Sequence, residues 1–120
     1  MKKSGSPSDY LQRLASALQS IDVRDVEEFI ELLILAKVND RLVLVAGNGG
    51  SAATASHMAT DLGIGSQRRH AGVRTVSCAD GSPIVTALGN DQGFEYVFAS
   101  QVQLLGRKGD LLIVVSASGN

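Results

Sequence analysis

The chain has 120 residues, of which 44% are hydrophobic and 19% charged, with a formal net charge of −1 and a single cysteine, Cys78. A near-neutral chain lacks the basic surface that binds nucleic acid, and one cysteine excludes an internal disulfide framework or a cysteine-based zinc cluster. No signal peptide and no apolar run of bilayer length is recognisable, so we expect a cytoplasmic protein in a reducing compartment, with no membrane partner.

The N-terminal part of the chain predicts a leader followed by two helices. Residues 1–7 have no periodic apolar pattern, and we expect them to be a disordered leader. Residues 8–40 form a helical segment for packing or oligomerisation, in which Ser8 or Asp9 caps a first helix that ends near residue 20. The second helix, 22–38, is apolar almost all round, which is typical of burial in a core or a subunit interface.

Residues 41–120 alternate between short apolar strands and helices. We expect strands at 41–46, 73–78 and 110–115, and helices at 52–62, 82–88 (capped by Ser82) and 94–105. This alternation predicts an α/β fold with an open parallel sheet and flanking helices, a Rossmann-like three-layer sandwich. A helix normally follows the last strand and covers the sheet, so we expect these residues to be the first part of a larger domain, incomplete at the C-terminus.

Two loops of small residues follow the first and third predicted strands. They are Gly47–Ser51 and Ser116–Asn120. Ligands of open α/β sheets bind beyond the carboxyl ends of the strands, where loop amides, serine hydroxyls and a helix N-terminus hold phosphate oxygens. The loops therefore predict a site for phosphate or a sugar phosphate, and a plain strand-to-helix turn is the alternative for the first loop.

His57 and Asp61 lie on one face of the helix that follows the first loop, because their spacing is i, i+4. An imidazole beside a carboxylate can transfer the proton of an aldose–ketose interconversion, and it can also supply two ligands to a divalent metal such as zinc. The alternative without chemistry is a polar contact of His57 beside a solvated Asp61. Asp91 either ends a helix or lines the site, and His70 is expected to be solvated in a basic loop.

A dinucleotide site is a second interpretation of the first loop. Gly47–Ala52 fits the fingerprint G-x-G-x-x-A, and Asp80 stands where an acid binds the ribose. However, Asp80 lies 28 residues after Ala52, longer than the usual spacing of about 20. The serine-rich second loop has no part in this fingerprint, so we expect no nucleotide cofactor.

The motifs, taken in order over residues 25–120, resemble the SIS (sugar isomerase) domain family. They are Gly47-Asn-Gly-Gly-Ser51 with His57 after it, Gly89-Asn-Asp91-Gln-Gly93, and Ser116-Ala-Ser-Gly-Asn120. Within the family the chain is most similar to phosphoheptose isomerases, which interconvert sedoheptulose 7-phosphate and a mannoheptose 7-phosphate in heptose biosynthesis.

The resemblance implies a role for each matching residue. The first substrate loop consists of Asn48, Gly49, Gly50 and Ser51, and the phosphate is bound by Ser116, Ala117 and Ser118. Asp91 lines the site. Asp61 takes the place of the usual catalytic glutamate, and His57 joins it in zinc-containing members. The family also implies a phosphorylated sugar as partner and a homo-oligomer, with a tetramer favoured and sites shared between subunits.

Three positions differ from the family pattern. Asp61 is one methylene shorter than glutamate, Thr60 stands where a glutamate is frequent, and Gly65 stands where an arginine is expected. The family's remaining metal ligands and its partner acid–base histidine fall outside this chain. A non-catalytic SIS module, which senses sugar phosphate or associates with the replication initiator, is therefore the alternative function; the acid at position 61 favours the isomerase.

Overall fold

The structure is a computed structural model, and it describes residues 5–65 and 72–119. Contacts divide the chain into two compact units, Met1–Glu31 and Leu32–Asn120. The division falls inside the second helix, whereas the sequence predicts the boundary between helical segment and α/β part at residue 40. The difference arises because Ala36, near the end of that helix, packs into the core of the second unit.

The first unit contains helix α1 (Pro7–Gln19) and the first part of α2 (Val23–Val38). The predicted cap at Ser8 or Asp9 is wrong, because Ser6 and Asp9 form a capping box: the Ser6 hydroxyl accepts from the Asp9 N–H at 3.2 Å, and the Asp9 carboxylate accepts from the Ser6 N–H at 2.7 Å. Pro7, whose φ is already helical, then occupies the first turn. The helix thus begins inside the predicted leader, whose residues 1–4 lie outside the described residues.

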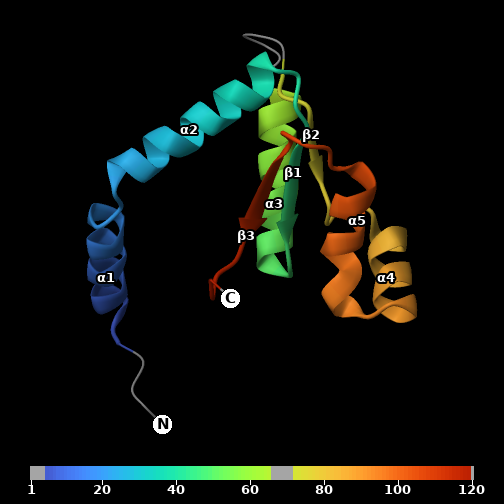
Figure 1. The fold of residues 1–120 in the computed structure, drawn as a ribbon. Coiled ribbons are helices and arrows are strands. Elements are labelled where there is room, and N and C mark those ends of the chain that lie inside the picture. The colour runs from blue at the N-terminus through green and yellow to red at the C-terminus, as the bar shows by residue number, and fades with distance from the viewer. Residues whose placement is uncertain (1–4, 66–71, 120) are drawn as a thin grey trace. The chain divides into compact units, whose positions relative to one another are not determined.

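The second unit is built on a parallel sheet with strand order β2-β1-β3, which confirms the predicted α/β class. The strands are β1 (Val43–Gly47), β2 (Thr75–Ser77) and β3 (Leu111–Val115). The connecting elements are α3 (Gly50–Gly63), α4 (Ser82–Asp91), the 3₁₀ turn η2 (Phe94–Tyr96) and α5 (Val97–Leu105) (Figure 1). The chain leaves the central strand β1 toward β2 and then crosses to β3 on its other side.

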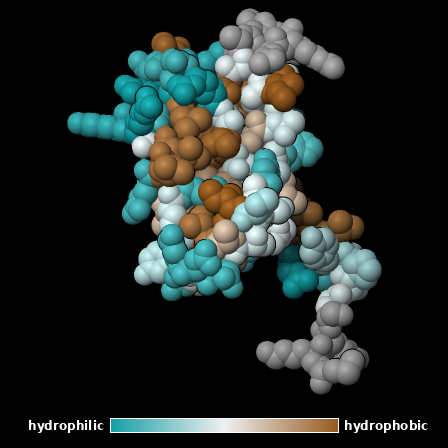
Figure 2. Space-filling model, turned by 90° about the vertical axis from the view of Figure 1, so that its right-hand side faces the viewer, coloured by the Kyte–Doolittle hydropathy of each residue, from teal (hydrophilic) through white to brown (hydrophobic). Residues whose placement is uncertain are grey.

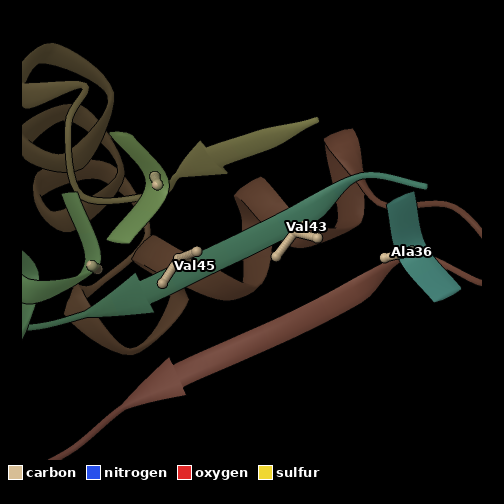
Figure 3. Close-up of a cluster of buried hydrophobic side chains, with 5 residues drawn as sticks. Ala36, Val43 and Val45 are labelled. Atoms are coloured by element: carbon tan, nitrogen blue, oxygen red, sulfur yellow. The ribbon is translucent and has the colours of Figure 1, made fainter. Parts of the chain in front are cut away.

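Alternate residues of β1 face opposite sides of the sheet. Val43 and Val45 pack with Ala55 and Ala59 of α3 and with Ala36, and Figure 3 shows the two valines projecting from the same strand. These side chains are almost fully excluded from solvent. Burial on both faces is the reason that this strand appears in the sequence as a continuous apolar run.

The opposite face of β1 packs toward α5. Leu44 and Ala46 form a second buried cluster with Cys78, and Phe98 of α5 packs against it. The Gln101 side chain is buried there, and its Nε2 donates to the Cys78 carbonyl at 2.9 Å. Burial raises the pKa of the Cys78 thiol, which therefore behaves as a small core residue.

The ends of several elements after β1 differ from the predicted ones. β2 is shorter than the predicted strand 73–78, because the Val73 N–H donates to the Leu62 carbonyl of α3 instead of joining the sheet. Ser82, predicted as a cap, is the first residue of α4; Gly81 occupies the N-cap position without a side-chain hydrogen bond. α4 also continues to Asp91 instead of ending at residue 88.

Part of the apolar surface of the second unit is exposed. Figure 2 views the side that carries α4 and α5, where brown side chains are visible among hydrophilic ones. Large exposed apolar residues are Ile84 of α4, Phe94 of η2, and Leu104 and Leu105 of α5. In the described ranges, no helix combines the length and apolar character that crossing a membrane requires.

Candidate functional site

The two loops of small residues lie next to each other at one edge of the sheet. β1 and β3 are neighbouring parallel strands, and their last residues, Gly47 and Val115, are paired in register (Figure 1). Asn48 and Ser116 therefore leave the sheet side by side. This is also the point where the chain direction across the sheet reverses, and open α/β sheets bind ligands at such a switch point.

Glycine gives the first loop its shape. A Cβ atom on Gly47 would lie 2.4 Å from the Ser51 carbonyl oxygen, so only glycine allows the chain to turn so tightly. Gly49 has φ of +56° and is the N-cap residue of α3, which has no side-chain cap. The amides at the start of α3 are thus left without a capping side chain, as an anion-binding helix N-terminus requires.

The second loop is held in a turn by its own serine. The Ser116 hydroxyl accepts a hydrogen bond from the Gly119 N–H at 3.0 Å and lies 3.4 Å from the Ser118 hydroxyl. Ser116, Ala117 and Ser118 are all exposed. Two hydroxyls in a preformed turn, beside the start of α3, are suited to contact the oxygens of one phosphate group.

His57 and Asp61 form a contact on the outer face of α3. The Nε2 atom of His57 lies 3.2 Å from Oδ2 of Asp61, and the two side chains are 79% and 67% exposed. They lie on the side of the helix opposite Ala55 and Ala59, which pack on the sheet. An open depression of about 610 Å³ runs along this face, lined by Ala53, Thr54, His57, Met58, Asp61 and Leu62.

His57 and Asp61 lie further along α3 than the two loops, which are at its start. At about 1.5 Å per residue, His57 is roughly 10 Å from the start of α3 at Gly50, and Asp61 roughly 16 Å. An open-chain sugar phosphate has its phosphate and its carbonyl group at opposite ends. Such a ligand needs one set of protein groups for each end. The chain provides two sets, the loops at the start of α3 and the pair of His57 and Asp61.

Asp91 is not joined to these groups by any hydrogen bond between described residues. It is the last residue of α4, and its Oδ1 accepts from Nδ2 of Asn90 at 2.8 Å. A carboxylate in the last turn of a helix is unfavourable with the helix dipole. Gly93, with φ of +109°, turns the chain into η2.

The described residues do not form a complete metal site. His57 and Asp61 offer two donor groups, and no group of three or more His, Cys, Asp or Glu side chains comes together in the described part of the chain. Zinc ordinarily has four ligands, so the donors present do not fit a resident zinc ion by themselves. His70 and its neighbours Arg68 and Arg69 lie outside the described residues.

Sequence reasoning missed a contact at the neighbouring strand end. The Ser56 hydroxyl of α3 is hydrogen-bonded to the Asp80 carboxylate, which follows β2. Asp80 is the residue that the dinucleotide interpretation needs for a ribose, but one of its oxygens is already occupied by Ser56. A separation of 24 residues leaves no periodic signal from which the sequence could indicate this pair.

Comparison with protein families shows the family of the chain. The SIS domain model matches residues 8–120. The chain belongs to the SIS domain family. It is 37% identical over 108 residues to a phosphoheptose isomerase of Neisseria gonorrhoeae, covering 90% of the chain and 55% of that protein. It is 40% identical over 95 residues to that of Helicobacter hepaticus, covering 79% of the chain and 48% of that protein.

Solved structures agree with this SIS domain assignment. The structure of the phosphoheptose isomerase GmhA from Neisseria gonorrhoeae matches with a TM-score of 0.69 and 35% identity, covering 92% of the chain and 62% of that structure. A phosphoheptose isomerase from Francisella tularensis matches with a TM-score of 0.79 at 24% identity, over 94% and 62%, and shows the shared fold. The chain spans about half the length of the curated relatives it matches.

Proposed function

We propose that this SIS domain binds a phosphorylated sugar and takes part in its aldose–ketose isomerisation, as in a phosphoheptose isomerase. The observation that carries the proposal is that the two loops of small residues lie side by side at the switch point of the sheet, at the start of the helix that bears His57 and Asp61. Relatives named phosphoheptose isomerase support a heptose 7-phosphate as the substrate.

The phosphate group is the part of the substrate that the loops hold. Amides at Gly49 and Gly50 and the hydroxyl of Ser51 would meet it from the start of α3. The hydroxyls of Ser116 and Ser118 would meet it from the end of β3. Asn48, Ala117 and Asp91 complete the proposed binding residues, with Ala117 contributing its backbone.

Asp61 is the proposed proton carrier. In the aldose-to-ketose direction its carboxylate removes the proton from C2 while the carbonyl oxygen on C1 gains a proton, which leaves an enediol, and the carboxylate then delivers its proton to C1. The C2 hydroxyl group loses its proton as its oxygen becomes the new carbonyl oxygen. This loss balances the proton gained by the oxygen on C1, so the composition of the sugar does not change. His57, whose Nε2 atom lies 3.2 Å from Oδ2 of Asp61, orients the carboxylate.

A homo-oligomer, with a tetramer favoured, is the second part of the proposal. His57 and Asp61 are largely exposed, whereas proton transfer through an enediol benefits from exclusion of water. A partner subunit that covers this face of α3 would supply that exclusion. The apolar stripe of α1 in the first unit, whose residues are all exposed, supports an interface between chains.

Zinc and the compartment complete the proposal. If zinc binds, His57 and Asp61 are the donors this chain offers, and further ligands have to come from outside the described residues. A cytoplasmic location suits a protein that acts on sugar phosphates and whose one cysteine is free and buried.

One experiment with two variants tests the proposed function. Binding of sedoheptulose 7-phosphate is measured by calorimetry, and turnover by a coupled assay, with and without zinc. Ser116→Ala combined with Ser118→Ala should weaken binding at least about 100-fold, since hydrogen bonds to charged groups contribute about 1.5–3 kcal/mol each. Asp61→Asn should retain binding and lose about 10²–10⁴-fold in kcat.

Each outcome separates the proposed function from the alternative. Unchanged affinity in the double serine variant would contradict the phosphate site. Binding without turnover in the unsubstituted protein would favour the non-catalytic SIS module, a sugar-phosphate sensor or an assembly factor. Ser20→Ala is the matched control, because its hydroxyl donates only to the Ala17 carbonyl of the same helix end.

A further inference from the structure

Helix α3 packs on the sheet mainly through small side chains. Its buried residues are Ala55 and Ala59, which pack against Val43 and Val45 of β1, and the partly buried Met58 packs against the same cluster. Alanine methyl groups bring the helix close to the sheet, and they leave few large side chains to fix its rotation about its own axis. A polar contact with another element adds to this packing in setting the rotation, and with it the direction of His57 and Asp61.

Ser56 provides a contact that resists this rotation. Its hydroxyl is hydrogen-bonded to Oδ1 of Asp80, beyond the end of β2, and also lies 3.0 Å from the Ala52 carbonyl oxygen. Thr54 and Thr60, in contrast, direct their hydroxyls to carbonyl oxygens of α3 itself. Ser56 thus ties the second turn of α3, one residue before His57, to a different strand end.

Asp80 is well suited as the fixed partner, because its loop is held from both sides. The Ala79 N–H donates to the Ser77 hydroxyl at 3.2 Å, and the Ser82 N–H donates to the Asp80 carbonyl at 3.0 Å. On the other face of the sheet, buried Gln101 holds the carbonyl of Cys78. The carboxylate is therefore presented from a loop with hydrogen bonds on both sides of Asp80.

The Asp80 side chain is directed to α3 and does not cap the helix that follows it, α4. Asp80 lies immediately before Gly81, the N-cap residue of α4, and α4 has no side-chain cap hydrogen bond. The carboxylate is bonded to α3 instead. Its interaction is charge-assisted, which makes it stronger than a bond between neutral groups.

We propose that Ser56 and Asp80 are positioning residues for the isomerisation: their hydrogen bond sets the rotation of α3 and so aims His57 and Asp61 at the reacting carbons. The inference rests on the proposed function. Misplacement of a reacting group by about 1 Å can lower a rate by about 10²-fold, so loss of this bond acts on turnover through Asp61. Neither residue needs to touch the substrate.

The test is Ser56→Ala in the full-length protein. We expect kcat to fall at least tenfold while KM changes less than about twofold, because the phosphate loops at Asn48 and Ser116 are untouched. Ser56→Thr should restore kcat, since it keeps the hydroxyl and an open depression beside Ser56 leaves room for the added methyl group. The assay is run well below the unfolding temperature of each variant.

The matched control is Ser16→Ala. Ser16 is also a helical serine whose hydroxyl donates to the carbonyl four residues earlier, but it has no partner on another element among the described hydrogen bonds. Its kcat should equal that of the unsubstituted protein. An equal loss in both variants, or full activity of Ser56→Ala, would overturn the positioning role.

A second readout keeps the inference separate from the proposed function. Amide hydrogen exchange along α3 is compared in Ser56→Ala, Asp80→Ala and the double variant. If the unsubstituted protein has no turnover, the proposed function fails, and exchange alone decides whether the pair holds the helix. Exchange that is at least fivefold faster in each single variant, with no further increase in the double variant, supports the hydrogen bond between Ser56 and Asp80 as the contact that holds α3. Exchange rates that are unchanged, or effects of the two substitutions that add in the double variant, would overturn the inference.

Discussion

His57 and Asp61 illustrate what residue spacing predicts and what it leaves open. Their i, i+4 spacing predicts a shared helix face, and the structure places Nε2 and Oδ2 3.2 Å apart. The spacing says nothing about which way that face points. The face lies opposite the alanines of α3, exposed to solvent, because only the packing of α3 on the sheet selects the buried side.

Gly47 carries the most sharply defined prediction at the residue scale. In Gly47→Ala the new Cβ would meet the Ser51 carbonyl 2.4 Å away, and backbone cannot move aside as a flexible side chain can. We expect the free energy of unfolding to fall by about 1–3 kcal/mol, measured by chemical denaturation. Gly50→Ala, where nothing lies within 4 Å of the added atom, is the control and should not be destabilised.

At the scale of elements, Asp110 shows how a turn is attached to the sheet. Its Oδ1 accepts from the Leu42 N–H at 2.9 Å, just before β1, and its Oδ2 accepts from the Arg107 N–H at 2.7 Å, in the turn before β3. The hydrogen bond from Leu42, and next that from Arg107, lower the pKa of the Asp110 carboxyl group. One carboxylate thus joins the beginnings of two neighbouring strands.

This attachment predicts a specific pH dependence of stability. Because the pKa of Asp110 is lower in the folded than in the unfolded state, its contribution is complete above the ordinary value of 3.8 and is lost as pH falls through the lowered pKa. Unfolding of the unsubstituted protein and of Asp110→Asn is compared at pH 7 and near pH 3. The difference between them should be largest at pH 7; an equal difference at both values contradicts the attachment.

Element ends were the least predictable feature of the fold. The periodic patterns of the helices and the apolar run of β1 indicated the elements correctly, because these patterns are local. The start of α1 was misplaced because Ser6, Ser8 and Asp9 are all residues that can cap a helix. Only the reciprocal bonds between Ser6 and Asp9 distinguish among them.

At the scale of the whole molecule, the proposed oligomer makes a testable prediction. Within the first unit, α1 exposes Tyr10, Leu11, Leu14 and Leu18. If this stripe packs against other chains, light scattering should give about four times the mass of one chain, and Leu14→Glu should dissociate the assembly. Gln12→Glu adds the same charge off the stripe and should leave it intact. A monomeric unsubstituted protein would contradict the proposed oligomer.

The sequence by itself determined the α/β class, the existence of each α-helix and strand, and the two loops that the proposed site needs. These features can be predicted from local periodicity, from glycine and serine content and from i, i+4 spacing, because each of these patterns extends over only a few residues. The tertiary structure alone decided that the loops at Asn48 and Ser116 adjoin, through the pairing of Gly47 with Val115. It alone joined Ser56 to Asp80, because contacts between residues far apart in the chain depend on strand order and register, which no local pattern encodes.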